Sequence, residues 1–255
     1  MSSRLPNPEF FQTVPKSPLP AWNLKRLASG VFRAFSLLAL VGLLPLDAKQ
    51  ASAQNLYWDS DPITGGTQGG SGNWTTTGSN WISGGTNGFW TNGGTAWFTM
   101  TGGTVNVTSG ISVGAMLFNA PGSGYTLTGS SLALSGGGGS QVNVQVVSDA
   151  AIMVRLTGLA GLSKSGMGTL TLTQPNSYSG ATTVNAGTLV YANLGGPGSG
   201  AVTVGSGGNL QFNIIDAAAS VSLSQPISLS GFLVKQGSGK LSLNTQPTGS
   251  GNVAV

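Results

Sequence analysis

The sequence predicts an all-β fold in which short strands stack as the coils of a solenoid. Short runs that alternate apolar and polar residues recur from residue 54 to the last residue, bounded by glycine or asparagine, and this period of two is typical of β-strands. A motif that begins at Leu162 returns at Leu233, 71 positions later. No stretch after residue 53 has helical periodicity. Because a short coil buries its apolar face only against its neighbours, the repeat favours a solenoid, with a β-sandwich as the alternative.

The distribution of charge separates the first 53 residues from the rest of the chain. The formal net charge is +4, and residues 1–53 carry six basic and two acidic residues. The remaining residues carry four of each kind, so that part of the chain is neutral. Four scattered cations cannot form the basic surface that a phosphate backbone requires, which argues against a nucleic-acid partner.

Residues 1–53 are predicted to be a secretory signal peptide with an extended basic leader. Basic residues precede an apolar run at 34–44, and Ala51 and Ala53 supply the small residues of the expected cleavage site. This order implies the Sec export machinery as a partner. The apolar run is shorter than the about 20 residues of a membrane span, so an uncleaved membrane anchor is the weaker alternative.

Residues 54–100 are rich in Trp, Gly and Asn, and we predict that they form N-terminal coils or a cap. Five tryptophans lie in this segment: Trp58, Trp74, Trp81, Trp90 and Trp97. The last four follow one another at intervals of seven, nine and seven residues, as expected for one ring per strand facing a core. The open end of a solenoid also needs apolar cover. The same flat rings could instead form a stacking platform for sugars, and both interpretations stay open.

Residues 101–158 are predicted to form irregular β-strand coils. Alternating runs at 104–108, 125–128, 131–135 and 142–147 are separated by turns that contain glycine. Glycine permits the positive φ angles that tight corners need, so each run is expected to be one strand of a coil.

Residues 159–255 carry two copies of the motif. The first copy comprises Leu162, Lys164, Gly166, Gly168, Leu170 and Leu172, followed by Tyr178, Gly180, Val184, Gly187 and Leu189. The second copy comprises Leu233, Lys235, Gly237, Gly239, Leu241 and Leu243, followed by Gly251 and Val255. Alternation places Leu170 and Leu172 on one strand face and the intervening threonines on the other. We predict a structural role for all of these residues.

One longer pattern runs through the first copy: Lys-Ser-Gly-Met-Gly-Thr-Leu-Thr-Leu at 164–172, Tyr-Ser-Gly at 178–180 and Asn-Ala-Gly-Thr-Leu at 185–189. This pattern resembles the autotransporter-associated β-strand repeat, a passenger-associated repeat of proteins displayed on bacterial surfaces. The resemblance implies a right-handed parallel β-helix that serves as a stalk or display surface. It also implies an outer-membrane β-barrel as a partner, which this chain lacks. Glycans and host or matrix surfaces are the candidate binding partners.

The second copy stops at Val255, before any counterpart of 185–189. We therefore expect this chain to be part of a longer autotransporter gene. A protein that is released without a barrel is the alternative.

The chain offers few groups for catalysis. It contains no His and no Cys, which excludes an imidazole base, a thiolate nucleophile and the usual zinc ligands. Asp59 and Asp61 could bind Ca²⁺ only weakly, because that cation takes six to eight oxygen ligands, so a turn is the preferred interpretation of this pair. Asp149 and Arg155 lie six positions apart without further charged residues between them. We predict no catalytic residue, no metal site and no cofactor.

The sequence therefore predicts a non-enzymatic exported protein, a passenger-like β-helical stalk that could also be adhesive. We expect it at the cell surface or outer membrane, or outside the cell. The alternative is a secreted carbohydrate-binding or matrix protein that uses the Trp-rich segment. A glycan-cleaving enzyme is a third and less supported class.

Overall fold

The computed structural model describes residues 55–136 and 140–255. The predicted signal peptide at 1–53, with Ala51 and Ala53, lies outside these residues. The described part belongs to one compact unit, Ala48–Val255, and contains strands but no helix. No helix in that part is therefore long and apolar enough to cross a membrane. The prediction of an all-β fold is confirmed.

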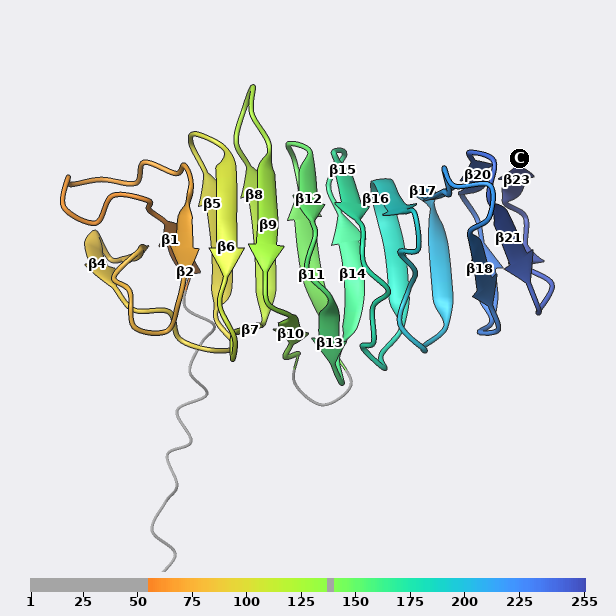
Figure 1. Cartoon of the computed structure of the whole chain (residues 1–255), viewed down its shortest axis with the longest axis horizontal. Helices are drawn as coiled ribbons and strands as arrows, with labels where there is room; N and C mark the ends of the chain where they lie inside the picture. Colours follow the sequence, from red (N-terminus) through yellow and green to blue (C-terminus); the bar gives the residue numbers. More distant parts are fainter. Residues whose placement is uncertain (1–54, 137–139) are drawn as a thin grey trace, which may run out of the picture. The chain divides into compact units, whose positions relative to one another are not determined.

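Parallel strands stack into three faces, here called faces A, B and C, and the chain visits them in turn (Figure 1). Face A contains β1 (Asn55–Trp58), β5 (Thr95–Thr99), β8 (Ala115–Asn119), β11 (Gln141–Val146), β14 (Gly161–Ser165), the first parts of β16 (Thr182–Ala192) and β17 (Val202–Asn213), β19 (Ile227–Leu229) and β22 (Thr248–Gly249). Face B contains β2 (Gly72–Trp74), β6 (Gly103–Val107), β9 (Tyr125–Gly129), β12 (Ala150–Ile152), β15 (Thr169–Leu172), the second parts of β16 and β17, β20 (Phe232–Gln236) and β23 (Asn252–Ala254). Face C contains β7 (Ser112–Val113), β10 (Leu132–Leu134) and β13 (Leu156–Gly158), and separately β18 (Ser220–Leu223) and β21 (Lys240–Leu243). The fold is thus a parallel β-solenoid, or β-helix, rather than a β-sandwich.

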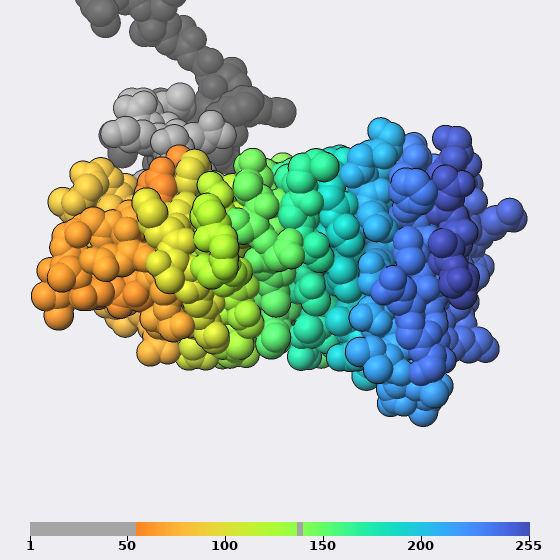
Figure 2. All heavy atoms as spheres, turned by 90° about the horizontal axis from the view of Figure 1, so that it is seen from above, coloured from red at the N-terminus to blue at the C-terminus, as the bar shows by residue number. Residues whose placement is uncertain are grey.

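The usual coil length is 20 residues. On face A, Asn143 pairs with Ser163, Ser163 with Thr183 and Thr183 with Thr203, and each step is 20 positions. Three coils are longer: Asn55 pairs with Thr95, 40 positions on, Ala115 pairs with Asn143, 28 positions on, and Thr203 pairs with Ser228, 25 positions on. The strands keep their parallel pairing across all three, so the additional residues lie outside the strands of face A. Figure 2 shows the coils as successive colour bands from residue 55 to residue 255.

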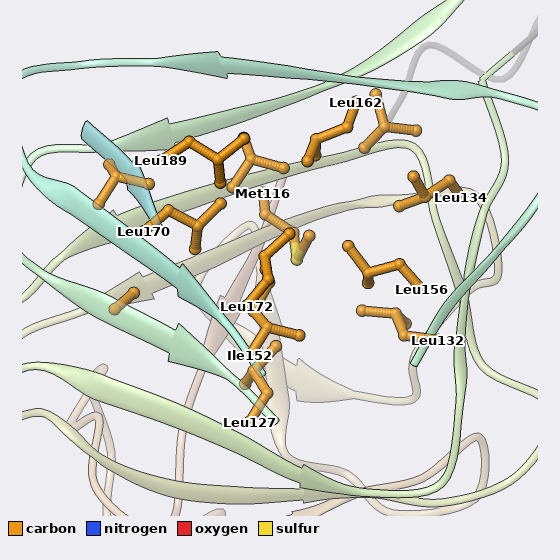
Figure 3. Close-up of a cluster of buried hydrophobic side chains, with 14 of the residues drawn as sticks. Met116, Leu127, Leu132, Leu134, Ile152, Leu156, Leu162, Leu170, Leu172 and Leu189 are labelled. Atoms are coloured by element: carbon orange, nitrogen blue, oxygen red, sulfur yellow. The ribbon is translucent and has the colours of Figure 1, made fainter. Parts of the chain in front are cut away.

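The interior is one hydrophobic cluster that runs through all three zones predicted from the sequence. Leu170 and Leu172 are buried while Thr169 and Thr171 are half-exposed, as the alternation predicts. Figure 3 shows leucines of β10, β13, β14, β15 and β16 directed into the space that the strands enclose. The boundaries of the zones at 54–100, 101–158 and 159–255 remain predictions, because one core connects them.

An antiparallel hairpin interrupts the parallel pattern in the first coils, which the sequence did not predict. β3 (Trp81–Ser83) pairs antiparallel with β1, and β4 (Thr86–Gly88) pairs antiparallel with β3. The hairpin covers the edge of β1 that faces away from β5. It leaves a three-residue strand at the outside, and short outer strands of this kind limit edge-to-edge association.

Candidate functional site

A cluster of aromatic rings fills the interior of the first coils. Trp58, Trp74 and Trp81 are fully buried and Trp90 is 4% exposed. The ring centroid of Trp74 lies 5.0 Å from that of Trp81 and 4.7 Å from that of Trp90, and Trp58 lies 5.3 Å from Trp81. Tilted and edge-on contacts at these distances are favourable. The four rings therefore have no open face for a sugar, so a stacking platform built on them does not fit the structure, whereas the core-or-cap interpretation does.

Trp97 is the exception among the five tryptophans. In β5 the flanking Ala96 and Phe98 are buried, and Trp97 points to the other side and is half-exposed. It pairs in register with Tyr57 of β1 and with Leu117 of β8. The ring centroids of Tyr57 and Trp97 are 5.0 Å apart. No spacing in the sequence signals this outward column of Tyr57, Trp97 and Leu117, because strand register joins residues up to 40 positions apart.

Lys164 is fully buried although it carries an ammonium group. Its Nζ donates to the carbonyl oxygens of Ser165 at 3.0 Å, Gly166 at 2.7 Å and Ala186 at 2.9 Å, so all three donors are used. Burial lowers the pKa of Lys164 to about 8, and the negative charge of Asp149 opposes that shift. The alternation itself could have revealed the burial, because Lys164 has the same strand parity as Leu162.

The lysine closes a corner that only glycine can make. Gly166, between β14 and β15, has a φ of 75°, and a Cβ on it would collide with the carbonyl oxygen of Val146 in the preceding coil. The second copy has the same corner: Gly237 has a φ of 80°, and the Nζ of Lys235 donates to its carbonyl oxygen. The Lys-x-Gly pattern therefore encodes a local corner in both copies.

The two copies nevertheless lie on different faces of the solenoid. The first begins in β14 on face A and continues in β15 on face B. The second begins in β20 on face B and continues in β21 on face C. The displaced residues are Leu233, Lys235, Gly237, Gly239, Leu241 and Leu243. The motif thus describes a strand, a corner and a strand, and not a fixed position within a coil.

The rest of the first copy packs inside the coils. The hydroxyl of Tyr178 lies 2.6 Å from the Thr182 hydroxyl and 3.2 Å from the Tyr191 hydroxyl. Burial raises the pKa of both tyrosines, which stay neutral donors and acceptors. Val184 and Leu189 are also buried. In the second copy, Gly251 is half-exposed and Val255 is fully exposed.

Gly180, Gly187 and Gly168 mark places where one coil approaches the next. A Cβ on Gly180 would meet the backbone of Ala160 and Gly161, and one on Gly187 would meet the backbone of 166–168. A Cβ on Gly168 would press against Val146. Side chains at these positions would push the coils apart.

The four carboxylates of the described chain accept backbone N–H groups. Asp59, Asp61 and Asp216 accept from the residue two positions on, as turn residues do, whereas Asp149 accepts from the next coil. The pairs are Asp59 with Asp61 at 3.1 Å, Asp61 with Ile63 at 3.1 Å, Asp149 with Thr169 at 2.7 Å and Asp216 with Ala218 at 2.9 Å. The Thr64 hydroxyl also donates to Asp61, and this hydrogen bond lowers the pKa of that carboxyl. Within residues 55–136 and 140–255, no three acidic, His or Cys side chains come together as metal ligands.

Comparison with known proteins agrees with this geometry. The passenger-associated-transport-repeat family matches residues 162–190, the strand–corner–strand unit of β14 and β15 together with most of β16. This segment of the chain is therefore similar to that repeat. It is also 32% identical over 234 residues to the adhesin BmaC autotransporter of Brucella suis biovar 1 (strain 1330), an alignment that covers 85% of this chain and 7% of that protein. The chain thus spans about 7% of the length of this curated relative. No solved structure matches.

Proposed function

We propose that this passenger-repeat protein is a non-enzymatic β-helical stalk that is exported and displayed at the cell surface, where it spaces or supports adhesive contacts. The observation that carries the proposal is the continuous parallel solenoid with a passenger-associated transport repeat inside it. Such a rod gives length and surface from stacked coils without an active site.

Two further points support the proposal. The relative from Brucella is described as an adhesin and an autotransporter, which favours surface localisation and an outer-membrane β-barrel as the partner in export. The described carboxylates all accept backbone N–H groups, and no three of them cluster, which favours a non-enzymatic protein. The predicted signal peptide at 1–53 and the Sec machinery complete this export route.

The test is to locate the protein on intact producing cells. We expect antibodies against residues 55–255 to label unpermeabilised cells, and proteinase K to remove the label while a periplasmic marker stays intact. The released material should give a β-rich circular dichroism spectrum. Labelling that appears only after permeabilisation, or a helical spectrum, would overturn the proposal.

A further inference from the structure

The outward side of face A carries no charged residue in the part of the chain that the structure describes. Its strands direct apolar side chains inward, and the outward side chains are mostly polar, with Trp97, Ala115 and Leu117 as the exceptions. The only ionisable group of β14, Lys164, points inward and is buried. By contrast, β20 of face B carries Lys235 and β21 of face C carries Lys240.

One column of small side chains, all polar except Ala115, runs along this outward side through the parallel register. Its members are Asn55, Thr95, Ala115, Asn143, Ser163, Thr183, Thr203, Ser228 and Thr248. At the roughly 4.8 Å spacing of neighbouring strands, the eight steps give a column of about 38 Å. Hydroxyls and amides thus repeat along the column, interrupted at Ala115.

A second column beside it begins with large side chains. Register places Tyr57, Trp97 and Leu117 in line, followed by Gln145 and Ser165. The rings of Tyr57 and Trp97 are half-exposed and tilted by 52° to each other. Face A therefore offers apolar ring surface at its first coils and hydrogen-bonding groups along the rest.

Part of the hydrogen-bonding capacity of these columns is used within the face. The Ser165 hydroxyl donates to Asn143 at 2.8 Å, and the Asn185 amide donates to Ser163 at 3.0 Å. These bonds orient the side chains across adjacent coils. The Asn143 amide nitrogen has no partner among the described residues, so it presents two N–H donors outward.

We propose that this uncharged face binds a linear neutral polysaccharide along its length, with Tyr57 and Trp97 stacking on the sugar rings. This inference rests on the proposed surface function and names the chemistry of its ligand. An acidic glycan or nucleic acid needs cations, which the outward side of face A lacks. A sugar chain needs flat apolar rings together with hydroxyl and amide partners, and these two columns provide both.

The test is isothermal titration of the purified full chain with three neutral hexasaccharides: cellohexaose, laminarihexaose and chitohexaose in its N-acetylated form. We expect saturable binding to at least one of them, little changed between low and high salt. Trp97→Ala should weaken that binding by about tenfold or more, the effect of losing one ring contact. Trp97→Phe keeps a ring and should retain most of the affinity.

Phe89→Ala is the matched control, because Phe89 is an aromatic residue of the same zone that is 62% exposed and lies outside the strands of face A. It should bind as the unaltered chain does. A circular dichroism melt of each variant separates loss of binding from loss of fold, and Tyr57→Ala provides the readout if Trp97→Ala unfolds.

Three results would overturn the inference: no binding to any of the three sugars, binding that survives both Trp97→Ala and Tyr57→Ala, or salt-sensitive binding to heparin in their place. Self-association that Trp97→Ala abolishes would show that the face contacts a second copy instead. Each of these results leaves the surface-display experiment unaffected, so failure here is distinguishable from failure of the proposed function.

Discussion

The two copies of the repeat share a sequence and a corner, but they differ in what surrounds that corner. In the first copy, Lys164 is fully buried and donates to three carbonyl oxygens, one of them in the next coil. In the second, Lys235 donates to the single carbonyl of Gly237 at the surface. Both copies keep the hydrogen bond from the lysine to the glycine two residues on, although they lie on different faces. Only Lys164 also donates to the next coil.

This difference separates two structural features of the motif, the local corner and the hydrogen bond to the next coil. The glycine with positive φ and the lysine that reaches two residues ahead define the corner from within the chain. Whether the lysine also joins one coil to the next depends on the coil that follows it. The same substitution made in each copy can therefore measure separately how much each feature contributes to the free energy of unfolding.

The largest effect should come from the corner glycines. Gly166→Ala and Gly237→Ala each place a Cβ where φ is positive and the backbone of the preceding coil is close. We expect each to lower the free energy of unfolding by about 2–4 kcal/mol, measured by urea unfolding followed through tryptophan fluorescence. Similar losses at both sites would support a shared corner. A loss confined to Gly166 would contradict it.

The next largest effect should distinguish the two lysines. Lys164→Met removes the donors of three carbonyl oxygens in a buried corner, and unsatisfied buried groups cost about 1–3 kcal/mol each. We expect a net loss of about 2–3 kcal/mol, because the apolar Met side chain refills most of the space but provides no donor. Lys235→Met should change stability by about 0.5 kcal/mol or less. Equal effects in the same unfolding assay would show that burial of the lysine does not matter.

A smaller effect is expected at Tyr178, whose counterpart 71 positions on is Gly249, so that only the first copy has this buried hydroxyl. Tyr178→Phe removes its contacts with Thr182 and Tyr191 while keeping the ring. We expect a loss of about 1 kcal/mol, read from the same urea midpoint. Tyr57→Phe is the control, since it removes a half-exposed hydroxyl and should be near neutral.

The last prediction concerns the pH dependence of stability. Burial lowers the pKa of Lys164 from 10.5 to about 8, so between these values the unfolded chain binds more protons than the folded one. Stability should therefore rise with pH across this window, and the gain should be lost as pH falls through about 8. The comparison is the unfolding free energy of the unaltered chain minus that of Lys164→Met at several pH values. A difference that does not change with pH would contradict the shifted pKa.

Several features could be predicted from the sequence because they depend on neighbours in the chain. The alternation at Leu170 and Leu172 gave the buried side of β15, and glycine at 166 gave a corner with positive φ. The repeat pattern led to the family that the comparison also finds at residues 162–190. A period of two and a left-handed backbone angle are local properties, so the residues themselves specify them.

Other features could not be predicted, because they depend on register between coils. Three coils after Leu162 the register reaches Ile227, 65 positions on. The remaining six positions of the 71-residue repeat place Leu233 in β20, so the second copy lies one face further on. The choice between core and platform for the tryptophans also depended on which rings pack against one another inside the first coils. The sequence left that choice open, and four of the five rings proved to be buried.

By itself, the sequence determined the class of the fold, the strand alternation and the corner chemistry of this protein, because each follows from short-range backbone and side-chain geometry. Only the tertiary structure decided which residues share a column. The alignment of Tyr57 with Trp97, the three carbonyl partners of Lys164 and the uncharged side of face A all arise from stacking. Parallel strands bring together residues 20 or more positions apart, and the pairing energy that selects this register is distributed over the whole solenoid.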